Sequence, residues 1–98
     1  MITDAQCRAA RGLLAWSQAL LATKSGVSRA TVADFEAGKR QPIANNLAAI
    51  RAALEQYGVE FIPENGGGAG VRLKFNRREV KAIDKLENEG GIVADDDV

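Results

Sequence analysis

Two short helical segments separated by one glycine constrain the fold of this chain most strongly. Ser17 and Ser28 are natural N-cap residues, because a serine hydroxyl accepts a hydrogen bond from the first turn of a helix. Gly26 lies between the two segments, and glycine adopts the positive φ of a tight turn at little cost. The pattern therefore predicts a helix that begins at Ser17, a sharp turn, and a second helix from Ser28 to about Ala37.

Another helix is predicted ahead of this pair. Thr3 and Gln6 have the spacing of a capping box. Apolar residues then recur at helical spacing, at Cys7, Ala10 and Leu14. Arg11 falls on the same face, and an arginine on a buried face needs an anionic partner.

A fourth helix is predicted from about Ala44. Its apolar stripe consists of Leu47, Ile50, Leu54 and Tyr57. Gly58 stands where a C-cap belongs. Residues 3–58 are therefore expected to form four short helices around one core, with Trp16 inside it.

The pattern changes after Gly58. Residues 59–62 and 71–75 alternate apolar and polar side chains around a glycine-rich loop, which predicts a β-hairpin. A lone hairpin is marginal in water, so its apolar face must cover the helical core or contact a second copy. A second capping-box pattern then predicts a short helix over about 77–88, and the acidic end from Gly90 is expected to be mobile.

The 13 basic and 13 acidic residues cancel over the whole chain but are unevenly placed. Residues 1–58 carry seven Lys and Arg against four Asp and Glu, whereas residues 82–98 carry one against six. A basic module joined to an acidic end is compatible with a polyanionic partner, and also with ordinary solvated faces.

Catalysis and metal binding find little support in this composition. The chain has no histidine and one cysteine, Cys7, so neither a zinc cluster nor an intrachain disulfide is expected. The glycine run of residues 66–70 lacks the Lys-Ser/Thr of a phosphate-binding loop. We predict no enzyme activity, no cofactor and no membrane span, and a lone thiol fits the cytoplasm.

The segment 17–38 resembles the helix-turn-helix of phage-repressor and Cro-like (XRE-type) regulators. The matching features are Gln18, Leu21-Ala22, Gly26, Val27-Ser28, Val32 and Glu36-x-Gly38, with Pro42 and Ala53-Leu54 beyond them. The resemblance covers about residues 3–58. It implies a mainly α fold, in which residues 1–58 form a repressor-like four-helix DNA-binding domain with a helix-turn-helix. The resemblance stops at Gly58; the residue patterns beyond it predict that residues 59–98 form a C-terminal hairpin, a short helix and an acidic tail, as an appendage for dimerisation or interaction.

In such proteins the second helix of the pair enters the major groove of DNA. We expect Arg29 to read guanine, and Gln18 to donate to a phosphate, as its position does in the family. Asp34 either accepts from cytosine N4 or orients Arg29. Ser28, Ala30 and Thr31, at the start of the same helix, are expected to make further contacts with DNA. Lys39, Arg40 and Asn46 are expected to contact the DNA backbone.

Three more residues have structural or ambiguous roles. The family often pairs an arginine and a glutamate at the positions of Arg11 and Glu36, which implies a buried ion pair here. Leu20 falls on the outer face of its helix, as an incidental surface residue or as part of a protein contact.

The predicted function is sequence-specific double-stranded DNA binding by a transcriptional regulator, acting as a homodimer. The alternative is a protein-interaction module, such as an antitoxin, that acts on a partner through the hairpin, the segment 77–88 or Leu20. Salt separates the two, because contacts to several phosphates weaken steeply as salt rises and apolar contacts do not.

Overall fold

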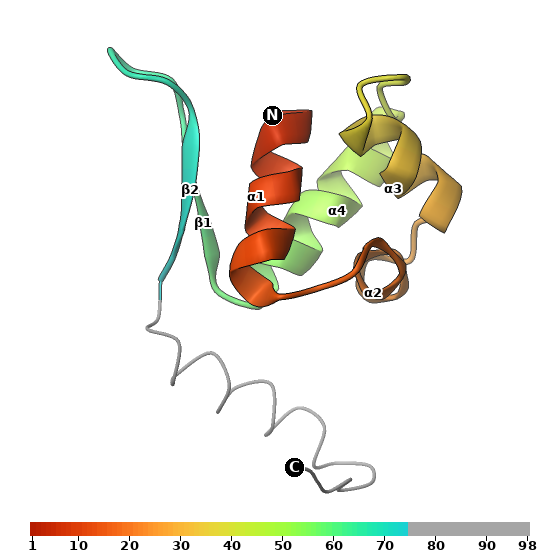
Figure 1. The fold of residues 1–98 in the computed structure, drawn as a ribbon. Coiled ribbons are helices and arrows are strands. Elements are labelled where there is room, and N and C mark those ends of the chain that lie inside the picture. The colour runs from red at the N-terminus through yellow and green to blue at the C-terminus, as the bar shows by residue number, and fades with distance from the viewer. Residues whose placement is uncertain (75–98) are drawn as a thin grey trace, which may run out of the picture.

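The computed structural model describes residues 1–74, which form four helices and then a two-stranded antiparallel hairpin (Figure 1). The elements are α1 (Asp4–Leu14), α2 (Gln18–Ser25), α3 (Arg29–Glu36), α4 (Ala44–Gln56), β1 (Val59–Ile62) and β2 (Gly70–Leu73). The predicted mainly helical fold with a hairpin after it is confirmed. The helix predicted over 77–88 and the end from Gly90 lie outside the described residues.

Side-chain caps fix where the first three helices begin. Thr3 and Gln6 form both hydrogen bonds of a capping box, at 3.0 and 2.9 Å. The Ser17 hydroxyl accepts from the backbone N–H of Leu20, and the Ser28 hydroxyl accepts from that of Thr31. These caps depend only on residues three positions apart, which explains why the sequence predicts them.

The end of α1 has no such signal in the sequence. Ala15 adopts the left-handed conformation, with φ 59° and ψ 37°, and is the one non-glycine residue with positive φ in residues 1–74. The turn sends Trp16 into the core, where its ring meets the edge of Tyr57 at 4.9 Å between centroids. Burial of Trp16 therefore holds an L-residue in a conformation that costs about 1–2 kcal/mol.

The hairpin covers the helical core with its apolar face. Val59 is buried in the core, while Phe61, Val71 and Leu73, on the same face, pack against it. The side-chain amide of Gln6 in α1 donates to backbone carbonyls of both strands, at 3.3 and 2.9 Å. Of the two roles left open by the sequence, the structure uses this face as a cover.

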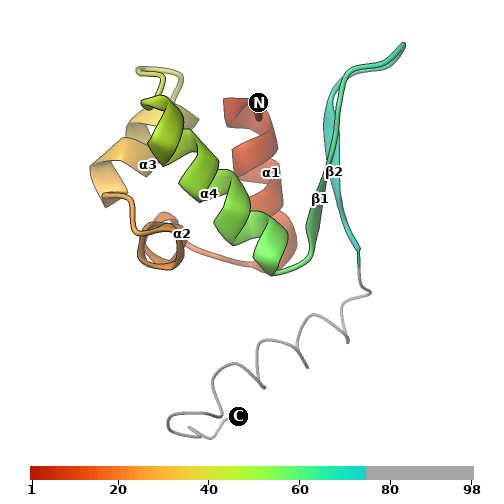
Figure 2. The ribbon, with the colours of Figure 1, turned by 180° about the vertical axis from the view of Figure 1, so that it is seen from behind.

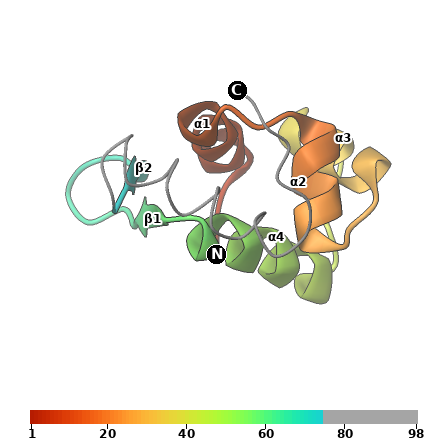
Figure 3. The same ribbon diagram turned by 90° about the horizontal axis from the view of Figure 1, so that it is seen from below.

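The hairpin and α3 lie at opposite ends of the molecule. From the front and from behind, α1 and α4 stand between them (Figures 1 and 2). The view from below gives the same arrangement, with β1 and β2 on one side and α2 and α3 on the other (Figure 3). The hairpin therefore leaves the outer surface of α3 uncovered.

The strained residue at the end of α1 predicts a stabilising substitution. Ala15→Gly removes the Cβ strain and should raise the free energy of unfolding by about 0.5–1 kcal/mol after the added flexibility of the unfolded chain is subtracted. Ala37, the exposed C-cap of α3, has an ordinary right-handed conformation, with φ −81°. The matched variant Ala37→Gly should therefore lower the free energy by a similar amount. Urea unfolding measures both, and shifts of the same sign would contradict this account of Ala15.

Candidate nucleic-acid interface

Helices α2 and α3 each bury one face in the core, and a tight turn joins them. Gly26 makes the turn with φ 73°, and Val27 is buried behind it. Val32 and Phe35 bury the inner face of α3. Packing on this face leaves the N-terminal outer edge of α3 in solvent.

A buried carboxylate joins the first three helices. Glu36, at the end of α3, has a side chain that is only 2% exposed. Arg11 from α1 grips it with two hydrogen bonds, from Nε to Oε2 at 2.8 Å and from Nη2 to Oε1 at 2.7 Å. Gln18 Nε2 from α2 donates to Oε1 at 3.0 Å, and the Cys7 thiol donates to Oε2 at 3.1 Å. We call these four side chains the Glu36 cluster.

The contacts of this cluster set the charge of its members. Burial alone would raise the pKa of Glu36, but hydrogen bonds from Arg11, Gln18 and Cys7 outweigh it and leave the pKa below its ordinary value. Burial, followed by the adjacent carboxylate, raises the pKa of the Cys7 thiol. Glu36 therefore stays ionised at neutral pH, while Cys7 stays protonated and acts as a donor.

The outer edge of α3 carries the residues expected to read bases. Arg29 and Ala30 are exposed, and Thr31 and Asp34 are half-buried. Within residues 1–74 no salt bridge joins Arg29 to Asp34, so the guanidinium is not held by that carboxylate. Ser28 donates its hydroxyl hydrogen to Thr31 Oγ1 at 2.8 Å, which couples these two side chains in the cap of the helix.

The loop after α3 adds two further cations, Lys39 and Arg40, and Arg40 lines the same depression as Ala30 and Thr31 of α3. The backbone N–H groups of Lys39 and Arg40 donate to the Asp34 carbonyl at 2.9 and 3.3 Å, which folds the loop against the helix. A depression of about 130 Å³ joins the two elements and is lined by Ala30, Thr31, Asp34, Arg40 and Pro42. The structure thus brings together side chains that the sequence separates by up to twelve positions. We call Arg29, Lys39 and Arg40 the cationic surface.

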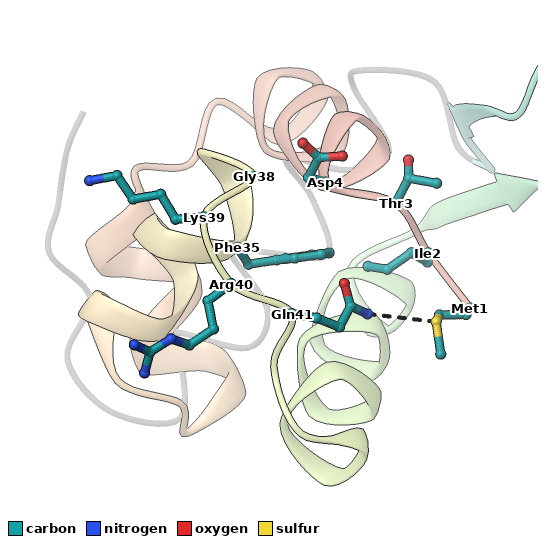
Figure 4. Close-up of a pocket in the computed structure, with 9 residues that line it drawn as sticks. All are labelled: Met1, Ile2, Thr3, Asp4, Phe35, Gly38, Lys39, Arg40 and Gln41. Carbon is teal, nitrogen blue, oxygen red and sulfur yellow. Dashed lines mark hydrogen bonds between the residues drawn. The ribbon is translucent and has the colours of Figure 1, made fainter.

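A larger hollow lies behind this loop, between it and the N-terminal segment (Figure 4). Phe35 and Ile2 point into it, and Gln41 Nε2 lies 3.6 Å from Met1 Sδ across its edge. The side chains of Lys39 and Arg40 point away from the hollow. Both charges are therefore directed to the outer side of the loop.

Two other predicted positions lie apart from the depression. Asn46 is half-buried in the first turn of α4 and does not line it. Leu20 is 37% exposed on α2.

Sequence reasoning missed three contributors to the site. The sequence did not predict that Cys7 and Gln18 donate hydrogen bonds to Glu36. It also did not predict that Pro42 lines the depression. The helical spacing of Cys7 and Arg11, four residues apart on one face, was an available signal for the first. The roles of Gln18 and Pro42 can be seen only in the tertiary structure.

Two capped helices around a glycine turn, with a solvent-exposed edge on the second, define a helix-turn-helix domain. The family model for helix-turn-helix proteins of the XRE (Cro/C1) type matches residues 8–61, and the chain belongs to this family of DNA-binding regulators. A search of curated proteins finds no match. In the part of the chain that the structure describes, no three side chains are grouped to hold a metal ion, and no helix is long and apolar enough to cross a membrane.

The Glu36 cluster predicts a pH-dependent stability difference. Glu36→Gln leaves the guanidinium of Arg11 without its counter-charge and should lower the free energy of unfolding by roughly 3 kcal/mol at pH 6. Because the pKa of Glu36 is lowered on folding, its contribution is present above pH 4.5, the ordinary value, and is lost as pH falls below it.

The difference between wild type and Glu36→Gln should therefore shrink between pH 6 and pH 3. Urea unfolding of both proteins at the two pH values measures it. A difference that is the same at both would mean that the Glu36 carboxylate does not stabilise the fold through its charge.

Proposed function

We propose that this protein is a transcriptional regulator that reads a specific double-stranded DNA sequence by placing α3 in the major groove. One observation carries the proposal: the inner face of α3 is locked in the core while its N-terminal edge, with Arg29, faces solvent at the end of the molecule away from the hairpin. A recognition helix needs this orientation, because its first residues contact the base edges.

The side chains divide into readers and backbone contacts. Arg29 can bond guanine O6 and N7 with two parallel hydrogen bonds. Asp34, half-buried in the depression, can accept from cytosine N4, and the exposed methyl group of Ala30 can touch a thymine methyl. Lys39 and Arg40 then contact phosphates and carry no sequence information.

Gln18 is a phosphate contact of a different kind. One of its two amide hydrogens is used by Glu36, which fixes the amide at the N-terminus of α2. The other hydrogen remains for a phosphate oxygen, beside the free backbone N–H groups of that helix end.

A homodimer fits this function best. One eight-residue recognition helix reads only a few base pairs, and a two-fold dimer presents two such helices about 34 Å apart to successive major grooves. We place such a regulator in the cytoplasm, where a lone cysteine stays reduced.

Contrasting substitutions at two cations test the proposal. Arg29→Ala should cost about 1–3 kcal/mol of binding free energy and relax the base preference at one position of each half-site. Lys39→Ala should weaken binding to all sequences alike and reduce the salt slope by about one. Selection of bound duplexes from a random pool, followed by titrations at several salt concentrations, measures both effects.

The outcomes that contradict the proposal are specific. An Arg29→Ala protein that selects the same sequence as wild type would remove Arg29 from the reading surface. If the wild-type protein enriches no sequence and its association with duplex DNA does not depend on salt, DNA recognition itself is wrong.

A further inference from the structure

Ion pairing within the described domain leaves positive charge unbalanced on one surface. Four carboxylates are each held by an arginine at 2.6–3.1 Å: Asp4 by Arg8, Glu36 by Arg11, Glu55 by Arg51 and Glu60 by Arg72. The three members of the cationic surface form no salt bridge within residues 1–74. One carboxylate, Asp34, lines the depression beside them. Three cations without a salt bridge in residues 1–74 therefore lie where the DNA backbone is proposed to lie, while Lys74 stands apart from them at the end of the hairpin.

The same chain carries the opposite charge beyond the domain. Residues 84–98 contain six carboxylates and one lysine, and residues 86–98 contain no basic residue at all. The carboxylates belong to Asp84, Glu87, Glu89, Asp95, Asp96 and Asp97. A tethered segment meets its own domain at an effective concentration in the millimolar range, so even weak charge attraction becomes significant.

The length of chain between the two is sufficient for contact. The backbone N–H of Lys74 donates to the Gly58 carbonyl at 2.7 Å, so the described chain ends beside the C-terminus of α4. Lys39 and Arg40 precede the other end of α4, whose 13 residues span about 20 Å. Asp95 comes 21 positions after Lys74. Even with the predicted helix over 77–88, which would span about 17 Å, the ten remaining positions can extend about 33 Å, which exceeds the length of α4.

We propose that the acidic segment of residues 84–98 binds the cationic surface of α3 and its following loop when no DNA is present, and competes there with the phosphate backbone. The inference rests on the proposed function, whose binding surface it regulates. The acidic segment carries negative charge, as the phosphates of DNA do, but it has no bases that α3 could contact. It therefore lowers binding to arbitrary DNA, which depends on backbone charge alone, more than binding to a cognate site that adds base contacts.

Charge-matched variants of the full chain test this competition. One variant is Asp95→Asn/Asp96→Asn/Asp97→Asn. The control is Glu55→Gln/Glu60→Gln/Glu64→Gln, which removes three negative charges from the last turn of α4 and the hairpin, away from α3; Glu55 and Glu64 are exposed and Glu60 is half-buried. The probe is a 24-base-pair duplex of arbitrary sequence, and its affinity is measured at low and high salt.

We expect the asparagine variant to bind this duplex about three- to tenfold more tightly than wild type at roughly 50 mM salt, and the control to gain less than twofold. The advantage should vanish near 300 mM salt, where charge contacts are screened. Equal gains in both variants would show a general charge effect and overturn the proposal, as would no gain in the asparagine variant.

A second measurement without DNA separates this inference from the proposed function. Amide chemical shifts of wild type and the asparagine variant are compared at low salt. Differences at the N-terminus of α3 and at residues 38–41 are expected, since the segment would leave that surface. Unchanged shifts there would overturn the proposal whatever the protein does with DNA. Absence of duplex binding by all three proteins would instead count against the proposed function.

Discussion

The buried carboxylate of Glu36 is the interaction on which the arrangement of this domain depends. It accepts hydrogen bonds from α1 and α2 while belonging to α3, so one charge fixes three helices relative to one another. A buried ion pair of this kind need not add net stability over an apolar core, but breaking it strands a charge. The clearest consequence of the ion pair is the orientation of α3. Because the C-terminal end of α3 is fixed, the helix has one packed face and one outer edge.

The remaining parts of the fold keep that edge open. The hairpin closes the core at the far side of α1 and α4, where Gln6 ties both strands to α1. Its outer face carries the Glu60–Arg72 pair, which lies in solvent. Apolar burial is thus completed at one end of the molecule, and positive charge is left at the other. This separation lets one small chain have a stable core and an uncovered binding surface.

Local chemistry explains which features the sequence could predict. Helix starts depend on a serine or threonine and a neighbour three residues on, and the turn at Gly26 depends on one glycine, so all were predictable. The end of α1 was not, because a buried Trp16 forces Ala15 into a conformation that alanine does not favour. The depression beside Asp34 was also not predictable, since Pro42 and Arg40 reach it only when the loop folds back onto α3. The hairpin itself could be predicted from alternation, but its role as a cover depends on contacts with α1.

The most direct test of the outward-facing α3 is a map of amide chemical-shift changes when the full chain is titrated with a short DNA duplex. The changes should concentrate at Gln18, residues 28–34 and the loop at residues 39–40, while the hairpin of residues 59–73 stays unchanged. Changes confined to the hairpin, with residues 28–34 unaffected, would contradict the central claim that α3 is the surface that meets DNA.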